Sequence, residues 1–384
     1  MKKNYTVYDT AKDLPIDWNQ QPQIKQLCLG IDSIEKAQVP NIKNYYVVTS
    51  YDDKPIFLSY YQLLSVTPLH FNLGEKKSQQ VALSLALRIV KPALLVAGNL
   101  FRHDVLFFQY LEQDFTAQEK AACYQETIDF MVNYTNASGI FLKDVEKSIA
   151  PFIQQDASYI QMQEDVSMEI TIPDHWKSFK DYEAELKHKY LQRCKKIRKS
   201  FEQIQIIEFD EVQIAKHAKE MELLYLQVSQ KQLVSMGIIN DQFFCELKSV
   251  MKDKYKVYGF FCQEKLIAFS SVIKHDDEYD MNYIGIDYAY NHQYQLYFNI
   301  LFHCLENAIA LDSRKLILGR TAPEAKAILG CEPDYRFSFY KLRNVIVNWF
   351  YKMVASYFHE QQGEKWKDRH PFKSSYYEEK KKIS

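Results

Sequence analysis

The chain has 384 residues, of which 47% are hydrophobic and 15% aromatic, so it holds enough apolar surface for two domains with separate cores. Its formal net charge of -1 argues against a protein that binds nucleic acid through its overall charge, and we expect no DNA partner. The seven cysteines form no C-x-x-C pair, which argues against a disulfide framework and a zinc site, so we expect no metal.

Two further classes of protein are not indicated. Residues 1–18 contain no apolar stretch of the length that a secretory signal requires. No window of the sequence has the uninterrupted apolar length that crosses a bilayer. We therefore expect a cytoplasmic protein.

One order of elements occurs twice along the chain. Each copy starts with a predicted β-hairpin, in which a β-branched and aromatic strand, a polar turn ending in lysine and a second strand follow one another. A strand, a long helix and another strand come next. The first copy comprises 44–63, 93–98, 118–133 and 139–143, and the second comprises 254–273, 281–287, 294–310 and 315–319. We predict two copies of one α/β unit, with a boundary near residue 165.

Between the copies, apolar residues recur at every third or fourth position from Phe179 to Phe201, which predicts one long amphipathic helix. Its other face is basic and carries no acid: Lys187, Lys189, Arg193, Lys195, Lys196, Arg198 and Lys199. This face is either a surface that reads phosphates or an ordinary solvated helix face. A strand at 204–209, a helix around 221–228 and a helix at 241–251 are predicted to follow.

The stretch GRTAPEAKAILGCEP, residues 319–333, contains a strand end and a short helix. Thr321 and Glu324 have the spacing of an N-terminal capping box, and Gly330 supplies a helix stop. The capping residues do not account for Arg320 and Lys326, two cations at a strand-to-helix junction of the kind where α/β sheets bind ligands. Each cation also has an ordinary explanation without a ligand. Arg320 could form a structural ion pair, and Lys326 could face the solvent.

The last segment, residues 346–384, begins with an aromatic amphipathic pattern and ends in a lysine-rich tail. Such a segment either contacts a membrane surface or packs as a helix on the protein body with a frayed charged end.

The succession of elements in the second half resembles the GNAT acyltransferase fold. The stretches that carry the resemblance are DYEAELKHKYLQRCKKIRKS, YGFFCQEKLIAFS and LGRTAPEAKAILGCEP. They are similar to tandem GNAT proteins related to Fem-type peptidoglycan aminoacyltransferases and to predicted N-acyltransferases of peptidoglycan biosynthesis or recognition. The fold implied is α/β (α+β), with two GNAT-like mixed β-sheet domains and flanking helices. The domains are then 1–165, a degenerate GNAT-like domain, 166–345, the acyltransferase domain, and 346–384, an amphipathic helix with a charged tail.

The resemblance implies an N-acyltransferase that moves an acyl group from an activated donor, acyl-CoA or a similar thioester, to an amine or hydroxyl acceptor. In this fold two neighbouring parallel strands splay apart, here 281–287 and 315–319, and their unpaired backbone groups receive the donor and the oxyanion. Two alternatives stay open. One is an aminoacyl-tRNA-dependent transferase of the cell envelope, with the tRNA as partner, and the other is a non-catalytic binding module of degenerate fold.

The sequence departs from the family pattern after the first splayed strand. Ordinary acetyltransferases of this fold have a glycine-rich loop there, whose backbone N–H groups hold the coenzyme pyrophosphate. The corresponding stretch here, DYAYNHQYQLY, contains no glycine. Its bulky side chains oppose the same close approach of the backbone, so a donor held by side chains is as plausible as acetyl-CoA.

Seven residues are candidates for the site that the resemblance implies. We predict catalytic roles for Tyr283, which could protonate the leaving group, and Glu324, which could act as a general base. We predict that substrate or donor is bound by Arg320, Lys326, Asn282, Asp287 and Thr321. His303 and Cys304 are consecutive on a helix, about 100° apart, and so do not form a nucleophile-and-base pair. His103 and Asp104 occupy a comparable place in the first copy, which we interpret as a partner domain.

Overall fold

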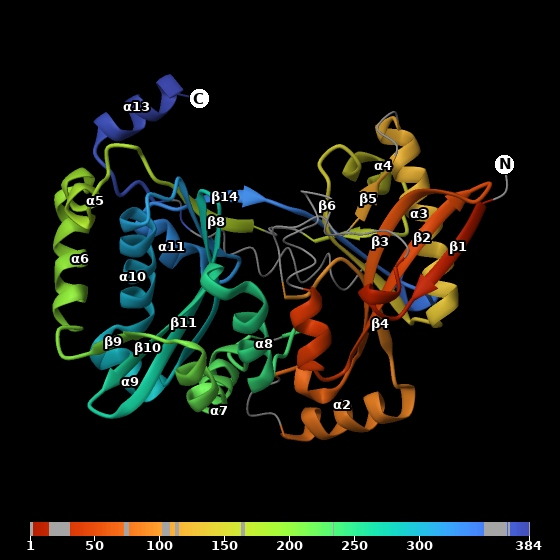
Figure 1. The fold of residues 1–384 in the computed structure, drawn as a ribbon, viewed down its shortest axis with the longest axis horizontal. Helices are drawn as coiled ribbons and strands as arrows, with labels where there is room; N and C mark the ends of the chain where they lie inside the picture. Colours follow the sequence, from red (N-terminus) through yellow and green to blue (C-terminus); the bar gives the residue numbers. More distant parts are fainter. Residues whose placement is uncertain are drawn as a thin grey trace. The chain divides into compact units, whose positions relative to one another are not determined.

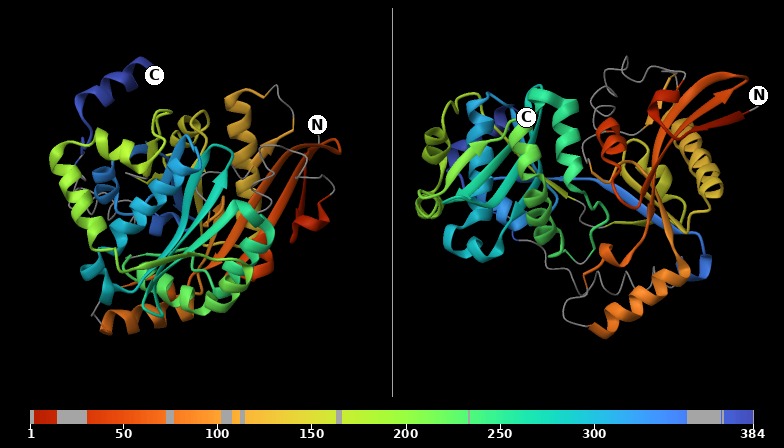
Figure 2. Two further views of the ribbon diagram at one scale, coloured as in Figure 1. Left: turned by 60° about the vertical axis from the view of Figure 1, so that its left-hand side comes forward. Right: turned by 60° about the horizontal axis from the view of Figure 1, so that its bottom comes forward.

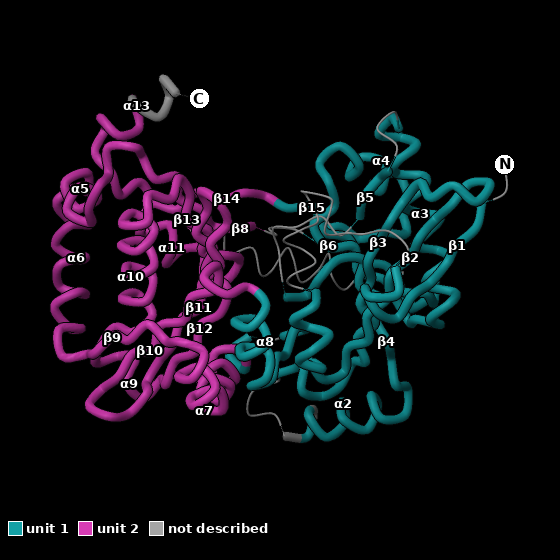
Figure 3. The backbone as a smooth tube through the Cα atoms, viewed as in Figure 1, with its two compact units in different colours: residues 1–165, 230–250, 336–363 teal, residues 166–229, 251–335, 364–384 magenta. Residues whose placement is uncertain are grey.

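The computed structural model describes residues 3–14, 31–72, 77–101, 108–111, 115–162, 166–232, 234–348, 367 and 369–383. The chain divides into two compact units (Figure 3). Unit 1 comprises residues 1–165, 230–250 and 336–363, and unit 2 comprises 166–229, 251–335 and 364–384. Each unit contains one mixed β-sheet with helices, so the predicted fold class is confirmed (Figure 1).

The described strands of unit 1 form an eight-stranded sheet in the order β1-β2-β3-β4-β6-β15-β7, with β5 beside β3. The predicted hairpin is present as the antiparallel pair β2 and β3, and β4 and β6 run parallel on either side of a helical crossover, as the repeat predicts. The bounds are β1 Lys3–Tyr8, β2 Ile42–Tyr51, β3 Lys54–Ser65, β4 Ala93–Ala97, β5 Phe108–Tyr110, β6 Gly139–Val145, β7 Ile160–Gln161 and β15 Phe337–Leu342.

The crossover helix of unit 1 is α3. Thr116 and Glu119 form a reciprocal capping box at its start, and Asn136 ends it in the left-handed conformation. Ile128 and Met131 lie on its buried face. The α-helices of unit 1 include α2 Lys77–Val90, α3 Ala117–Thr135, α4 Ala150–Gln154 and α8 Asp241–Met251, whose last residue is assigned to unit 2.

The described strands of unit 2 form a seven-stranded sheet in the order β14-β8-β13-β12-β11-β10-β9. The second predicted hairpin is the antiparallel pair β10 and β11, and β12 and β13 are the parallel neighbours of the second copy. The bounds are β8 Val166–Thr171, β9 Gln205–Glu208, β10 Tyr255–Cys262, β11 Lys265–His275, β12 Glu278–Ile286, β13 Lys315–Gly319 and β14 Glu332–Tyr335.

Helices cover both faces of the unit 2 sheet (Figure 2). Helix α7 packs against β11 and β12, where a Cβ on Gly285 would lie 2.7 Å from the Cβ of Leu224. Ile286, the next residue of β12, belongs to the core cluster that contains the buried face of α10. The helices of unit 2 are α5 Phe179–Glu185, α6 His188–Lys199, α7 Glu211–Ser229, α9 Tyr288–Tyr294, α10 Leu296–Ala310, α11 Pro323–Leu329 and α13 Ser374–Ile383.

The prediction of one helix from Phe179 to Phe201 is wrong, because the chain is extended at Leu186 and two helices, α5 and α6, result. Leu186 forms an antiparallel bridge with Phe372. The N–H of Lys187 donates to the carbonyl of Pro371 and the N–H of Lys373 to that of Glu185, each at 2.8 Å. These bonds satisfy the backbone groups that the helix break exposes.

Both units are assembled from separate stretches of the chain rather than from consecutive halves. Strand β15 lies between β6 and β7 in unit 1, although it follows the whole second copy in sequence. Residues 367 and 369–383 return to unit 2. Most of the aromatic segment predicted after residue 346 lies outside the described residues. In the described part of the chain, no helix has the length and apolar character to cross a bilayer.

Candidate functional site

The strands β12 and β13 part within the sheet of unit 2. Their parallel ladder consists of three pairs, Glu278 with Lys315, Tyr279 with Leu316 and Asp280 with Ile317. Strand β12 continues to Ile286 and β13 to Gly319, so the facing edges beyond the third pair are not paired with each other. The predicted splay is confirmed. The β12–β13 ladder is thus interrupted inside the sheet, where the backbone groups of neighbouring strands ordinarily pair with each other.

The first copy does not show this arrangement in its described residues. Strand β4 is paired with β6 from Leu94 to Ala97, so Ala93 is the one residue of β4 outside this ladder. The space beside the ends of these strands holds a cavity of only about 10 Å³, lined in part by Tyr61, Phe108 and Tyr124. Lys143 and Asp144 form a buried ion pair there at 2.6 Å. His103 and Asp104, the candidates in this copy, lie outside the described residues.

Lys326 is the most unusual side chain near the splayed strands. It lies on α11, is 1% exposed, and its Nζ donates to the carbonyl oxygen of Gly319, the last residue of β13, at 3.1 Å. Burial lowers the pKa of this amine to about 7, because the charged form loses its hydration. The solvent-facing alternative is therefore wrong. At pH 7 the amine of Lys326 is therefore protonated in part of the molecules and neutral in the rest, and it lies at the end of the splayed strand β13.

The local backbone explains why α11 brings Lys326 inward. Gly319 has φ 77°, and Ala322 adopts the left-handed conformation directly before the helix. Gly330 ends the helix with φ 102°, as predicted, and a Cβ there would lie 2.2 Å from an atom of the Phe372 ring. The helix is thus fixed at both ends by tight turns.

The predicted capping box of α11 is wrong. The residue before the helix is Ala322, without a side-chain cap, so the spacing from Thr321 to Glu324 is displaced by one residue. Thr321 is exposed. Glu324 is also exposed and forms an ion pair with Arg369. Arg320 is half-buried and directly follows β13, where the sequence placed it.

The two candidates on β12 lie beyond its last pair with β13. Asn282 is half-buried, and its Oδ1 is a buried atom that has no hydrogen-bond partner among the described residues. Tyr283 points toward the opposite face, where its ring meets Tyr225 of α7 edge-on at 5.5 Å between centroids. Its backbone N–H donates to Ser271 Oγ at 3.0 Å. A buried acceptor without a partner is costly, which makes Asn282 a group suited to bind a polar ligand.

Asp287 has a structural role at the start of α9. Its carboxylate accepts from the N–H of Ala289 at 3.1 Å and pairs with Lys265 Nζ at 2.9 Å. At the start of α10, Asn291 Oδ1 accepts from the N–H of Tyr297 at 3.1 Å. Side chains therefore occupy N–H groups at both helix starts, and one of them is an anion. This arrangement disfavours the backbone grip on a pyrophosphate that a glycine-rich loop provides.

Sequence reasoning missed Tyr297 on α10. Its hydroxyl oxygen is buried and has no hydrogen-bond partner among the described residues, and burial raises its pKa. With 28 tyrosines in the chain, no local sequence signal distinguishes this one. Together, Asn282, Tyr297 and Lys326 provide an acceptor, a hydroxyl and an amine with unused hydrogen-bonding capacity.

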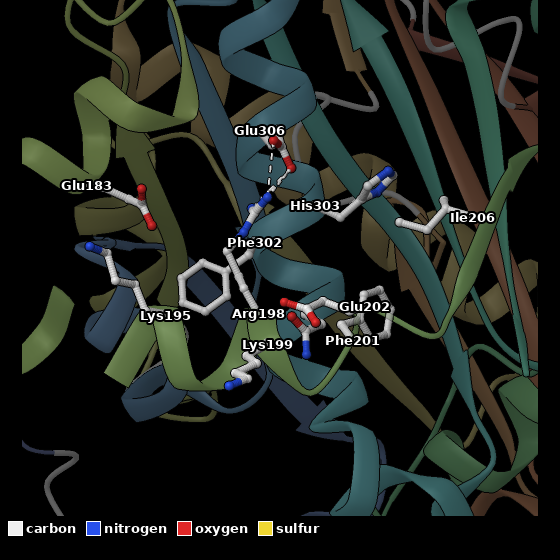
Figure 4. Close-up of a pocket in the computed structure, with 11 residues that line it drawn as sticks. Glu183, Lys195, Arg198, Lys199, Phe201, Glu202, Ile206, Phe302, His303 and Glu306 are labelled. Atoms are coloured by element: carbon white, nitrogen blue, oxygen red, sulfur yellow. Dashed lines mark hydrogen bonds and ion pairs between the residues drawn. The ribbon is translucent and has the colours of Figure 1, made fainter. Parts of the chain in front are cut away.

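A second feature of unit 2 is an open hollow of about 540 Å³ between α6, β9 and α10 (Figure 4). Arg198 Nη1 and Nη2 each lie 3.0 Å from Glu306 Oε2 across it, and Lys195 and Lys199 lie at its border. Burial lowers the pKa of His303 to about 4, so the imidazole is neutral at pH 7. The adjacent Cys304 is fully buried and its pKa is raised to about 12, consistent with a packing role.

Comparison with known proteins concerns the fold. No protein-family model and no curated protein matches the chain. Among solved structures, FemX superposes with a TM-score of 0.52 and 8% identity over 92% of this chain and 100% of FemX. A tandem GNAT protein from the clavulanic acid biosynthesis pathway, solved without AcCoA, has a TM-score of 0.50 and 8% identity, covering 88% of this chain and 98% of its own. The chain has the tandem GNAT fold.

Proposed function

We propose that this chain is an acyltransferase that moves an acyl group from an activated donor, acyl-CoA or a similar thioester, to an amine or hydroxyl acceptor. The observation that carries the proposal is the end of the β12–β13 ladder at Asp280 and Ile317, with the amine of Lys326 buried at the end of β13. Unit 1, whose corresponding strands stay paired, serves as a partner domain without a second active site.

The reaction follows from the groups at this place. An extended donor pairs with the free edge of β12, as an added strand would. The acceptor nitrogen or oxygen attacks the donor carbonyl directly and releases its proton to solvent, and the carbon–sulfur bond breaks. The thiolate leaves and takes a proton, for which Tyr283 is the candidate donor, and Tyr283 regains its proton from solvent. The buried thiols of Cys304 and Cys331 have pKa values raised to about 12, so neither supplies a thiolate nucleophile at pH 7.

Lys326 and Arg320 are the cations of the proposed site. Protonated Lys326 stabilises the oxyanion or an anionic group of the donor in a water-poor place, where one such contact has a large effect. Arg320, at the lip of β13, binds a phosphate or carboxylate through its planar guanidinium. Because side chains occupy the starts of α9 and α10, we propose that side chains rather than a backbone loop hold the donor.

A second candidate function is transfer from aminoacyl-tRNA in the synthesis of the cell envelope. The observation in its favour is the surface of α6, where Lys189, Lys195, Lys196 and Lys199 are exposed. Lys195 and Lys199 also line the hollow shown in Figure 4. A polyanion bound there would be released steeply by salt. The third candidate function is a non-catalytic binding module, which has the same fold as the enzyme but does not catalyse acyl transfer.

The test is a transfer assay with the purified full chain, a panel of acyl-CoA thioesters and aminoacyl-tRNA, and amine and hydroxyl acceptors. We expect Lys326→Met and Arg320→Ala to lower kcat/KM by about 100-fold or more while thermal stability is retained. Lys256→Met is the matched control, because Lys256 is a partly buried lysine of β10 that pairs with Glu208, and its loss should change activity less than about twofold.

The outcomes separate the three readings. Turnover with thioesters that requires Lys326 supports the proposal. Turnover with aminoacyl-tRNA alone, with binding that weakens with salt, supports the second candidate. Donor binding without turnover under any condition identifies a binding module, and full activity of Lys326→Met removes the proposed role of the buried amine.

A further inference from the structure

An exposed apolar stripe runs along α2 of unit 1. Val81, Leu85 and Ile89 are 68%, 59% and 73% exposed, and their spacing of four residues places them on one face of the helix. Leu69, in the 3-10 turn Pro68–His70 that precedes α2, is 74% exposed, and Val90 is 68% exposed. Single exposed apolar residues are ordinary on a protein surface, but a contiguous stripe marks an interaction site.

The stripe is separate from the face by which α2 packs on its own unit. Leu83 and Leu87, four residues apart on another side of the helix, are half-buried. Figure 2 shows α2 at the margin of unit 1, apart from the layers formed by its sheet and α3. The described part of the chain has fifteen exposed large apolar side chains, and five of them lie in α2 or in the turn before it. Packing among the described residues of unit 1 therefore does not account for them.

The charges of α2 and of the residue on either side of it have one sign. From Lys76 to Lys91 the sequence contains no acidic residue. Arg88 is exposed and lies on the helix next to the line of Val81 and Leu85, and Lys91, directly after the helix, is exposed as well. An apolar face bordered by cations without acids is complementary to a bilayer surface that contains anionic phospholipids.

We propose that α2 docks on an anionic lipid surface. Val81, Leu85 and Ile89 enter the boundary between headgroups and acyl chains, and Arg88 and Lys91 contact lipid phosphates. A second copy of the chain seated on the same stripe would bring these cations against each other without a compensating acid from α2. The proposal goes beyond the acyl transfer proposed above and does not depend on it.

The test is flotation of the purified full chain with vesicles of phosphatidylcholine alone or mixed with phosphatidylglycerol. We expect binding to the mixed vesicles, weaker binding to the neutral ones, and loss of binding as salt screens the cations. The double variant Leu85→Ser/Ile89→Ser should bind the mixed vesicles roughly tenfold less or worse. Arg88→Glu should lower binding to mixed vesicles and leave the weak binding to neutral vesicles unchanged.

A matched control comes from α7 in unit 2. Val212→Ser/Leu223→Ser also removes two exposed apolar side chains, which are 75% and 56% exposed, and it should leave vesicle binding unchanged. Circular dichroism melts of all variants should coincide with the wild type, because the changed side chains are exposed. The proposal is overturned if the wild type does not float at low salt, or if both double variants bind equally. It is also overturned if sedimentation shows that the stripe mediates self-association instead.

Discussion

Burial of the Lys326 amine lowers the stability of the fold, because the charged form loses its hydration. Its one hydrogen bond to a described residue is to Gly319 O, although an ammonium has three donors. Strongly shifted pKa values of this kind concentrate at functional sites, since a well-packed apolar side chain would be more favourable for folding alone. The proposed role in the donor site gives a reason for a side chain that stability alone does not favour.

Replacing this amine should change how stability depends on pH. The pKa of Lys326 in the folded chain is about 7, below the ordinary lysine value of 10.5. Between these values the unfolded chain binds a proton that the folded chain does not, so the free energy of unfolding rises with pH by up to about 1.4 kcal/mol per pH unit. Below pH 7 both states are protonated and the cost of the buried charge is fully present.

Urea unfolding of wild type and Lys326→Met between about pH 6 and pH 9 measures this contribution. We expect Lys326→Met to lack the rise above pH 7 and to equal or exceed the wild type in stability at the acidic end. Parallel pH profiles for the two proteins would show that Lys326 does not titrate in this range.

Tyr297 offers a separate test at the scale of one atom. Tyr297→Phe removes a buried hydroxyl that has no partner among the described residues, so thermal unfolding should be unchanged or shifted upward. If the hydroxyl binds the donor, the same variant should raise the dissociation constant of the donor by roughly tenfold. A marked loss of stability would instead show that the hydroxyl is satisfied within the fold.

At the scale of elements, the break between α5 and α6 depends on a segment far along the chain. Phe372 is 1% exposed, and its ring centroid lies 4.1 Å from that of Tyr376 and 5.7 Å from that of Trp176. The same residue bridges Leu186 and fills the space against Gly330 at the end of α11. One aromatic side chain thus fixes the helix pair and the helix that carries Lys326.

We expect Phe372→Ala to lower the free energy of unfolding of unit 2 by about 3–5 kcal/mol, because it leaves a cavity among the rings of Trp176, Tyr182, Tyr376 and Tyr377. Lys373→Ala is the control, since its side chain is exposed and its loss should cost less than about 1 kcal/mol. Urea unfolding followed by tryptophan fluorescence, to which Trp176 of this cluster is one of four contributors, measures the two midpoints. Similar midpoints for the two variants would contradict the anchoring role.

The elements that sequence predicted well are those with local start and stop signals. Strand β13 ends at Gly319, and both hairpins turn at short polar segments, so their patterns are complete within a few residues. The helix predicted from Phe179 to Phe201 failed because its break at Leu186 depends on residues 371–373, which no local pattern reveals. The capping box of α11 failed because the left-handed Ala322 shifts the helix start by one residue.

At the scale of the molecule, the candidate site was only partly accessible to sequence reasoning. The splayed strands were predicted from the resemblance to the GNAT fold, which assigned them to the strands that carry Asn282 and precede Lys326, and the end of the β12–β13 ladder confirms the splay. Alternation and spacing alone did not show that Asp287 caps α9, that Glu324 turns outward to Arg369, or that Tyr297 is buried. Those outcomes depend on packing between elements that are distant in sequence.

The interleaving of the units has a consequence for how the chain folds. Strand β15 completes the sheet of unit 1 between β6 and β7, and α8 packs in the same unit, although both follow the start of unit 2 in sequence. Unit 2 in turn needs Phe372 from the end of the chain. A fragment of residues 166–345 therefore contains β15 and α8 without their partners and lacks the aromatic anchor.

We expect the fragment 166–345 to unfold without a cooperative transition, whereas the full chain unfolds cooperatively. The buried residues Ser338 and Phe339 of β15 would be exposed in the fragment, which favours aggregation through an unpaired strand. Circular dichroism melts and sedimentation of the fragment, compared with residues 166–384, measure the two effects separately. The longer fragment regains Phe372 but still exposes β15, so we expect it to recover part of the transition. A cooperative melt of 166–345 would show that the second copy is an autonomous domain.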